Sequence, residues 1–289
     1  MAKSEAVVLR QFEQRDIAPC GGICYEAFRA IAQRHGFPPD LPSPEVGVAI
    51  METLYDDPGF YGIVVERGGT VLGSSWLDER NAVSGIGPVT IDPAAQDGGL
   101  GRRLMEATIE RSDARGFSSV RLVQAAYHAR SLSLYTKLGF ASRGELVVMD
   151  DPAEDSSLSG YAIRPLRVED LRACNDICTS VLGFHRGAEL AAAGAARTAF
   201  VAERDGAIRA YTSGLGYFGH SAGQTTEAIC ALLTEAPRLP SLGVLVPARN
   251  YQLFRWCLDH GMRVVETMTL MCRGLYQDPS GAYLPSILY

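Results

Sequence analysis

The chain has 289 residues, 47% hydrophobic and 21% charged, a composition typical of a globular protein with room for two domains. Its formal net charge of −6 provides no overall positive field, so neither nucleic acid nor an anionic membrane is an expected partner. The seven cysteines form no dense framework of the kind expected for a disulfide-rich protein. No apolar run approaches the length of a membrane span, about 18 residues, and the first residues lack the apolar core of a signal peptide. We therefore expect a cytoplasmic protein.

Two stretches of the chain repeat one residue pattern. In an ungapped alignment of "LRQFEQRDIAPCGGIC" with "IRPLRVEDLRACNDIC", Arg10 meets Arg164 and Asp16 meets Asp170. Each stretch predicts a short strand, a polar turn and an apolar-periodic helix. Later, "VVERGGTVLG" and "VAERDGAIRA" each predict two strands joined by a tight glycine turn. We therefore expect a tandem duplication of one α/β unit.

The segment "DDPAEDSSLSG", residues 150–160, is acidic, small and polar, and it predicts a linker. This places an N-terminal domain at 1–149 and a C-terminal domain at 161–289.

The two halves also share a pair of cysteines spaced four residues apart. Cys20 and Cys24 correspond to Cys174 and Cys178. Four thiolates are a zinc ligand set, but each pair lies one helical turn apart in a separate copy. Small buried thiols on the core face of each copy explain the pattern more simply, and we expect no metal site.

A glycine-rich bend follows the strand predicted by "SGIGPVTI". The bend "DPAAQDGG" leads into a helical pattern of Leu100, Leu104, Ala107 and Ile109, with Gly116 as its C-cap. The first N–H groups of a helix lack intrahelical partners and carry partial positive charge, and glycine lets an anion approach them. The bend therefore predicts a phosphate-binding site.

The spacing of this bend excludes two common phosphate loops. It matches neither the dinucleotide pattern G-x-G-x-x-G nor the triphosphate pattern G-x-x-x-x-G-K-[ST]. The pattern present is Gln96-x-x-Gly99-x-Gly101, with Pro93 three residues before the glutamine. It resembles the acetyl-CoA signature [RQ]-x-x-G-x-[GA] of the GNAT superfamily of N-acetyltransferases.

The resemblance implies a fold and a cofactor site. Each unit would be α/β (α+β), with a mixed, mostly antiparallel central sheet flanked by helices. The bend would hold the CoA pyrophosphate through its amides, and the preceding strand would contact the pantetheine arm. Arg102 and Arg103 either add charge near the phosphates or are solvated residues of the first helical turn. The residues implied for the acetyl-CoA site are Val89, Thr90, Ile91, Gln96, Asp97, Gly98, Gly99, Leu100, Gly101, Arg102, Arg103, Ser131 and Tyr135.

A second family signature follows at the usual distance. "SVRLVQAAYHARSLSLYTKLGF" resembles a strand followed by N-x-x-[AS]-x-x-L-Y-x-x-x-G-F, with Ser131, Tyr135 and Gly139 in place. His128 stands where the family has Asn, which puts that amide contact in doubt. The resemblance makes Tyr135 the candidate general acid, since a phenol stays protonated at neutral pH and can protonate the CoA thiolate. The alternative for Tyr135 is a packed aromatic residue.

The general base is left open by the sequence. Asp78 and Glu79 end a predicted strand on the side where an amine would enter, and His128 titrates near neutral pH. We expect the base among them, with Glu79 and His128 as the catalytic candidates besides Tyr135. The alternative for each carboxylate is a solvated strand end.

The second half lacks the corresponding cofactor motifs. After "AIRAYTSGLGYF" no Q-x-x-G-x-G follows, and Cys257 takes the place of the tyrosine before Gly261. We expect a degenerate copy that keeps the fold. Tyr211, Tyr217, Phe218 and His220 belong either to an acceptor pocket or to an ordinary core. The apolar tail "GLYQDPSGAYLPSILY" is expected to pack back on a domain.

The expected function is acetyl-CoA-dependent transfer of an acetyl group to a primary amine, by direct attack in a ternary complex. The acceptor is a small-molecule or protein amine, and the sequence sets no oligomeric state. One alternative is a non-catalytic acyl-CoA-binding sensor, and another is a structural module whose bend binds nothing.

Overall fold

The structure is a computed structural model that describes residues 6–151, 153, 160–238 and 242–289. Most of the predicted linker at 150–160 lies outside the described residues. The chain forms two compact units, the first made of Met1–Glu79, Ser84–Val120 and His128–Gly139, the second of Arg80–Val83, Arg121–Tyr127 and Phe140–Tyr289. Among the helices that the structure describes, none combines the length and apolar character needed to span a membrane.

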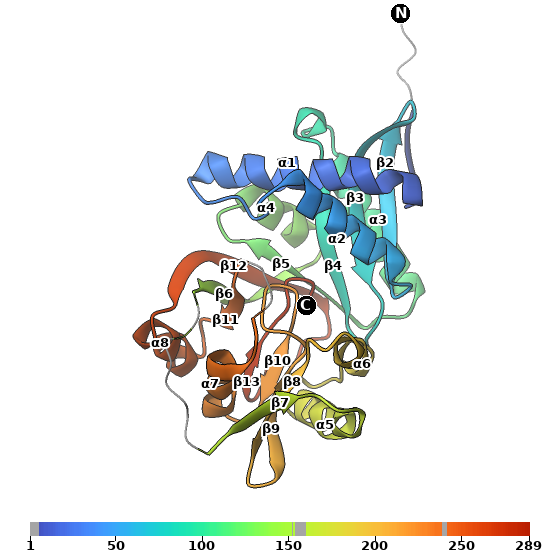
Figure 1. Cartoon of the computed structure of the whole chain (residues 1–289). Helices are drawn as coiled ribbons and strands as arrows, with labels where there is room; N and C mark the ends of the chain where they lie inside the picture. The colour runs from blue at the N-terminus through green and yellow to red at the C-terminus, as the bar shows by residue number, and fades with distance from the viewer. Residues whose placement is uncertain (1–5, 152, 154–159, 239–241) are drawn as a thin grey trace, which may run out of the picture. The chain divides into compact units, whose positions relative to one another are not determined.

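The first unit is an antiparallel sheet with helices on both faces (Figure 1). Its strands pair in the order β1-β2-β3-β4. Strand β5 (Ser119–Ala125) begins in this unit and continues into the second. The elements of the first unit are β1 (Val7–Gln11), α1 (Ile17–His35), α2 (Pro44–Asp56), β2 (Phe60–Arg67), β3 (Thr70–Asp78), β4 (Ser84–Ile91), α3 (Leu100–Ala114) and α4 (Ala129–Lys137).

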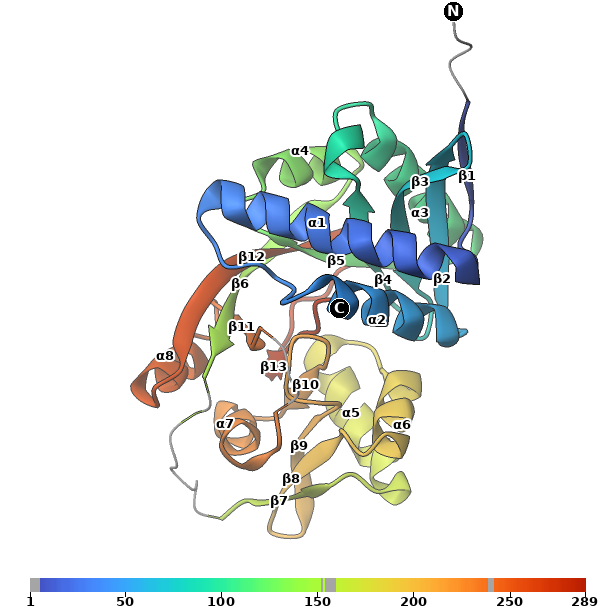
Figure 2. The same ribbon diagram turned by 45° about the horizontal axis from the view of Figure 1, so that its top comes forward.

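Alternation along β2 fixes the two faces of this sheet. Ile63 and Val65 pack with Leu100 and Leu104 of α3, whereas Val64 between them is fully buried on the other face. Helices α1 and α2 cover that other face (Figure 2). Burial on both sides explains why Ile63, Val64 and Val65 of β2 are all apolar, with no polar residue between them.

The second unit contains two sheets. The two hairpins that the sequence predicts are both confirmed, one in each unit. One sheet has the strand order β13-β10-β9-β8-β7 and the other β5-β12-β6-β11. The elements of the second unit are β6 (Ala141–Asp150), β7 (Ala162–Pro165), α5 (Leu171–Leu182), α6 (Gly187–Ala195), β8 (Phe200–Arg204), β9 (Ala207–Thr212), β10 (Ser221–Gly223), α7 (Thr226–Glu235), β11 (Val244–Pro247), α8 (Tyr251–Asp259), β12 (Arg263–Gly274) and β13 (Ala282–Leu284).

Helices α5 and α7 lie on opposite faces of the β7–β10 sheet (Figure 2). On β8, Val201 packs in the core of α5, and its neighbour Ala202 packs in the core of α7. The C-terminal tail closes the sheet edge, because β13 pairs with β10 and buries Tyr283 to 4% exposure. The prediction that the apolar tail packs back on a domain is confirmed.

Strand β6 is held between two strands from the other half of the sequence. It pairs antiparallel with β12 on one side and with β11 on the other, and Leu146 faces Met268 and Pro247. The packing therefore does not follow the predicted boundary at 149, because β6 precedes the linker but belongs to the sheet of the second unit. The apolar sequence of β6 favours this central position: Leu146, Val147, Val148 and Met149 are at most 4% exposed.

The hydrogen bonds around β6 and β12 repeat with the same spacing in both halves. Ala126 donates its N–H to the Thr267 carbonyl at 2.9 Å, and Ala248 donates to the Glu145 carbonyl at 3.0 Å. In one half β12 thus lies beside β5, and in the other β6 lies beside β11. β6 and β12 each thus lie beside a strand from the other half of the sequence.

A buried ionic motif also occurs once in each half. Arg10 contacts Asp16 at 2.6 Å and Glu66 at 2.9 Å. Arg164 contacts Asp170 at 2.6 Å and Glu203 at 3.0 Å. In both, the aspartate also accepts a backbone N–H bond at 2.8 Å from the residue three positions before it. The Arg–Asp match seen in the sequence thus corresponds to one strand-to-helix connection built twice, which supports the predicted duplication.

Candidate active site

The predicted bend joins β4 to α3 through a short 3-10 turn at Pro93–Ala95. Asp92 accepts the N–H of Ala94 on its side chain at 2.9 Å. The Gln96 side-chain amide donates to the Ile91 carbonyl at 3.2 Å, so the signature glutamine ties the bend to the end of β4. The side chain of Gln96 thus has a structural role of its own, beside any contact of its backbone.

Gly99 is the N-cap of α3 and has a left-handed backbone, with φ +76°. Glycine adopts this conformation without strain, and here it turns the chain into the helix. Within the described residues, no side chain caps this N-terminus, and Asp97, Gly98 and Gly99 are exposed. The first-turn N–H groups of α3, beginning at Leu100, are therefore available to an anion from outside.

The charged side chains near the bend are already engaged at the surface. Arg102 pairs with Glu106 at 3.4 Å, and Arg103 donates to the Val7 carbonyl at 3.3 Å. Asp97 is paired with Arg130 at 2.7 Å. Arg130, from the first turn of α4, is a cation at the bend that the sequence analysis did not single out. In the sequence, only the position of Arg130 within the second signature pointed to a place near the site.

Contacts between α4 and the bend bring the two signatures together. A Cβ at Gly101 would stand 4.0 Å from Leu134 and 3.8 Å from Ile91, so the glycine leaves α4 close to the start of α3. The Arg130–Asp97 pair joins the same two elements. Residues separated by a strand and a turn in the sequence thus lie together in the first unit.

The end of β4 lies against β3 in close register. Val89, Thr90 and Ile91 pair with Ser75, Ser74 and Gly73, and a bulge follows between Ser75 and Leu77. A Cβ at Gly73 would lie 2.3 Å from the Thr90 carbonyl oxygen, so only glycine permits this approach. The buried Thr90 hydroxyl has no hydrogen-bond partner within the described structure.

Helix α4 carries the candidate acid and its neighbours. Tyr135 is 9% exposed. Burial raises the pKa of Tyr135, and a hydrogen bond with Ser131 opposes that rise. Ser131 also lies 2.8 Å from Nδ1 of His128, the N-cap of the helix. Burial, followed by the charge of Arg130, lowers the pKa of His128 to about 4, so its imidazole is neutral at pH 7.

The predicted base Glu79 is held by two arginines. Arg111 donates to it at 2.7 Å and 3.1 Å, and Arg115 lies 3.2 Å away. The Arg111 guanidinium also stacks over Tyr61 at 4.2 Å. Arg111 belongs to α3 and Arg115 is its C-cap, so the pairing depends on how α3 packs on the sheet. A carboxylate fixed in this way is poorly placed to exchange a proton with a substrate.

One acidic residue near α1 was not recognised from the sequence. Asp40 lies between α1 and α2, and its Oδ1 is buried with no hydrogen-bond partner among the described residues. Burial raises the pKa of Asp40 to about 6. Its surroundings in the sequence, "FPPDLPSP", resemble an ordinary loop, and no local pattern signals this burial.

The corresponding places in the second half are filled by other groups. Thr225 caps α7 by accepting the Ala228 N–H at 3.3 Å, whereas α3 has no side-chain cap. Cys257, at the position of the tyrosine, is fully buried. Asn250 accepts the Leu253 N–H at 3.1 Å as an ordinary helix cap. The degenerate copy expected from the sequence remains a prediction, with these observations in its favour.

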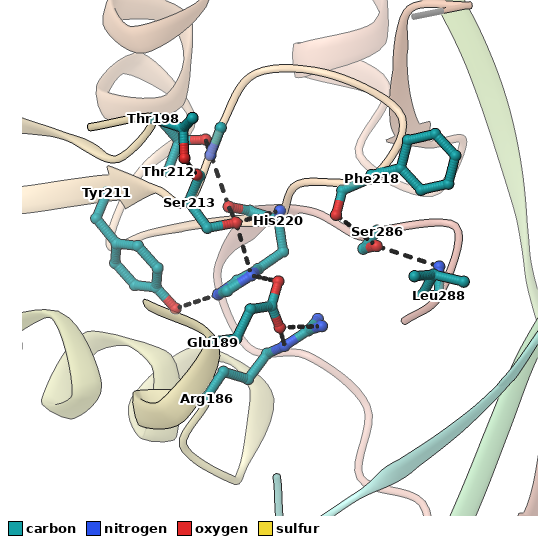
Figure 3. Close-up of polar contacts among 11 residues, drawn as sticks. Arg186, Glu189, Thr198, Tyr211, Thr212, Ser213, Phe218, His220, Ser286 and Leu288 are labelled. Atoms are coloured by element: carbon teal, nitrogen blue, oxygen red, sulfur yellow. Dashed lines mark hydrogen bonds and ion pairs between the residues drawn. The ribbon is translucent and has the colours of Figure 1, made fainter. Parts of the chain in front are cut away.

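Two of the candidate acceptor residues of the second half, Tyr211 and His220, belong to a buried ionic network (Figure 3). His220 contacts Tyr211 at 3.1 Å, Ser213 at 3.1 Å and Glu189 at 2.9 Å, and Arg186 donates to Glu189 at 2.9 Å. Burial opposes ionisation of Glu189, but the Arg186 charge holds its pKa below the ordinary range. Tyr211, Tyr217 and His220 are at most 7% exposed, which favours the core interpretation for these three.

Comparison with known proteins adds independent evidence. The model of the Acetyltransferase (GNAT) family matches residues 26–140. An IAA acetyltransferase of Azospirillum brasilense is 34% identical over 106 residues, which are 36% of this chain and 67% of that protein. A mycothiol acetyltransferase of Amycolatopsis mediterranei is 32% identical over 114 residues, 34% of this chain and 37% of that relative's own length.

The fold of the chain as a whole also has solved counterparts. A GCN5-related N-acetyltransferase of Sphaerobacter thermophilus has a TM-score of 0.63 at 17% identity, and the match covers 94% of this chain and 96% of that one. Both compact units are therefore included in the structural match. On the matched family model and the Azospirillum relative, the chain belongs to the acetyltransferase (GNAT) family.

Proposed function

We propose that the chain is an acetyl-CoA-dependent N-acetyltransferase whose active site lies in the first unit and whose acceptor is a primary amine. One observation carries the proposal: α4 packs against the bend, so Tyr135 is on the helix that flanks the uncapped N-terminus of α3. An anion site and a buried acid on adjoining elements are what acyl transfer from a phosphate-bearing thioester requires.

The residues present at the bend fit the cofactor. A Cβ at Gly99 would meet no atom within 4 Å, so there is open space above the first turn of α3. We propose that the backbone amides of residues 96–102 hold the pyrophosphate, with Val89, Thr90 and Ile91 along the pantetheine arm. Arg103 and Arg130 supply positive charge beside these amides. Bound acetyl-CoA supplies an activated acyl group on a thiol leaving group.

Tyr135 is suited to protonate that leaving group. Because burial raises its pKa, the phenol stays protonated throughout the neutral and mildly alkaline range. Of the predicted bases, His128 has a neutral imidazole at pH 7, whereas Glu79 is committed to two arginines. We therefore propose His128, rather than Glu79, as the group that takes a proton from the amine.

The test is thiol release from acetyl-CoA across a panel of primary amines. We expect release by the unaltered protein and a loss of kcat of about 100-fold or more in Tyr135→Phe. Tyr251→Phe, at an exposed tyrosine of α8, is the matched control and should behave as the unaltered protein. Acetyl-CoA that raises the melting temperature without any thiol release would instead support a sensor, and unchanged release by Tyr135→Phe would remove the assignment of the acid.

A further inference from the structure

Three side chains at the start of α4 form a continuous hydrogen-bonded chain. Ser131 lies 2.8 Å from Nδ1 of His128, and it stands four residues before Tyr135 on the same helix, where burial raises the pKa of the phenol and hydrogen bonding by the serine hydroxyl lowers it. A serine hydroxyl donates one hydrogen bond and accepts others, so it can transmit a proton from one partner to the other. The family motif allows Ala or Ser at this position and has Asn at the helix cap, so neither a relaying hydroxyl nor an imidazole is prescribed by it.

The arrangement follows from the geometry of the helix. Ser131 and Tyr135 are four residues apart and lie on the same face. His128, as N-cap, lies one turn before Ser131 and directs its Nδ1 to the serine. Tyr135 is buried and Ser131 half-buried, so bulk water does not easily replace the serine between the other two groups.

We propose that His128, Ser131 and Tyr135 form a proton relay that couples deprotonation of the amine to protonation of the thiol leaving group. This inference rests on the proposed function. Ser131 is the positioning residue, since it acts through its two neighbours rather than on the substrate. No residue of the second half repeats the chain, because Leu253 and Cys257 stand at the equivalent positions.

The relay conserves protons in each turnover. The amine nitrogen gives a proton to Nε2 of His128, and Nδ1 of His128 gives its own to the Ser131 oxygen. Ser131 passes its hydrogen to the Tyr135 oxygen, and the phenol hydrogen goes to the departing sulfur. One N–H bond of the amine and one S–H bond of the thiol are exchanged, and no net charge stays on the protein. Rotation of the serine hydroxyl and tautomerisation of the imidazole through water restore the starting state.

The charged surroundings of His128 keep the relay from storing the proton. Besides burial, Arg130 of α4 and both His35 and Arg34 at the end of α1 disfavour the cationic form of the imidazole. In the relay His128 therefore gives up its Nδ1 proton as it takes one at Nε2. The same groups predict that the relay works wherever the imidazole is neutral, over the whole range above about pH 5.

The first experiment needs no cofactor. Nitrogen NMR of the ligand-free protein reports the tautomer and pKa of His128 in the unaltered chain, in Ser131→Ala and in Ser133→Ala. Ser133 is an exposed serine of the same helix and serves as the matched control. We expect Ser131→Ala to shift the Nδ1 resonance and the titration of His128, and Ser133→Ala to leave both unchanged. Unchanged His128 resonances in Ser131→Ala overturn the relay alone.

The second experiment follows turnover. In mixtures of light and heavy water, kcat is plotted against the deuterium fraction of the solvent. The plot for the unaltered protein should be curved, because several protons move together, and the plot for Ser131→Ala should be a straight line. We expect kcat about 10-fold lower in Ser131→Ala and partly restored in Ser131→Thr, which keeps the hydroxyl. A straight line for the unaltered protein contradicts the relay. Absence of thiol release by the unaltered protein with every amine overturns the proposed function and the relay together.

Discussion

At the scale of single residues, the site combines side chains placed by helical spacing with side chains placed by packing. Ser131 and Tyr135 share a face of α4 because four residues make about one helical turn. Glu79, by contrast, is bound by arginines of α3 and its C-cap, and its partners lie 32 and 36 positions along the chain. Its sequence neighbours suggested a carboxylate open to substrate, and the fold gives it a fixed ion pair instead.

Asp40 yields a pH-dependent prediction at this scale. Its pKa is about 6 in the folded protein and near 4 when unfolded, so the folded state binds more protons between these values. The free energy of unfolding should therefore fall as pH rises through this window and stay lowered above pH 6. Asp40→Asn removes this cost, and we expect it to stabilise the protein at pH 7.5 by up to about 3 kcal/mol and much less at pH 4.5.

Urea unfolding of both proteins at the two pH values measures this difference. Asp176→Asn, at an exposed carboxylate of α5, is the control and should change the free energy of unfolding equally little at both. A gain in Asp40→Asn that is the same at pH 4.5 and 7.5 would show that the unpartnered Oδ1 carries no ionic cost.

At the scale of elements, the two halves differ at the start of equivalent helices. α3 begins at a glycine with no side-chain cap, whereas Thr225 closes the N-terminus of α7. A helix with a side-chain cap has fewer free N–H groups to offer an anion, so the N-terminus of α7 is less suited to anion binding than that of α3. This contrast favours cofactor binding by the first half alone.

The bend itself gives the second prediction. Gly99 has φ +76°, which costs an L-residue about 1–2 kcal/mol, while Gly98 has no left-handed backbone and room for a Cβ, with the nearest atom 3.9 Å away. Gly99→Ala should therefore lower the free energy of unfolding by about 1 kcal/mol and weaken acetyl-CoA binding. Gly98→Ala is the paired control with little expected change in stability. Chemical unfolding and calorimetry with acetyl-CoA measure both, and equal effects of the two variants would contradict the role of the backbone angle.

At the scale of the whole molecule, the halves are joined by strands rather than by a linker alone. β6 is paired on both edges by β11 and β12. Its apolar residues are thus paired with a strand that lies more than 90 residues later in the chain. The predicted domain boundary separates β6 from β11 and β12 in the sequence, but in the structure these strands pair with one another.

Truncation tests this dependence. A chain ended after Asp150 keeps β6 but loses both of its partner strands, and we expect it to aggregate or to unfold without cooperativity. Circular dichroism and size-exclusion chromatography distinguish this from a folded monomer. When residues 1–155 and 156–289 are produced together as separate chains, they should copurify, because the β6–β11 and β6–β12 ladders remain. A soluble, cooperatively unfolding 1–150 monomer would contradict this dependence.

The sequence by itself determined the local features of this protein. The glycine bend, the spacing from Ser131 to Tyr135 and the repeated Arg–Asp motif were all readable, because turns, caps and helical faces depend on residues within a few positions of one another. The family and the half that should bind the cofactor followed from these motifs. They did not reveal which partners the charged side chains around the bend would contact.

Only the tertiary structure decided the features that join distant segments. The place of β6 between β12 and β11, the arginine pairing of Glu79 and the burial of Asp40 each depend on contacts between residues far apart in the chain. The side chains of an apolar strand such as β6 alternate between the two faces of the sheet, and this alternation does not specify which strands pair with its edges. Local chemistry therefore singled out the candidate cofactor bend and the candidate acid, while long-range packing determined which strands cover β6 and which carboxylate is bound by α3 and its C-cap.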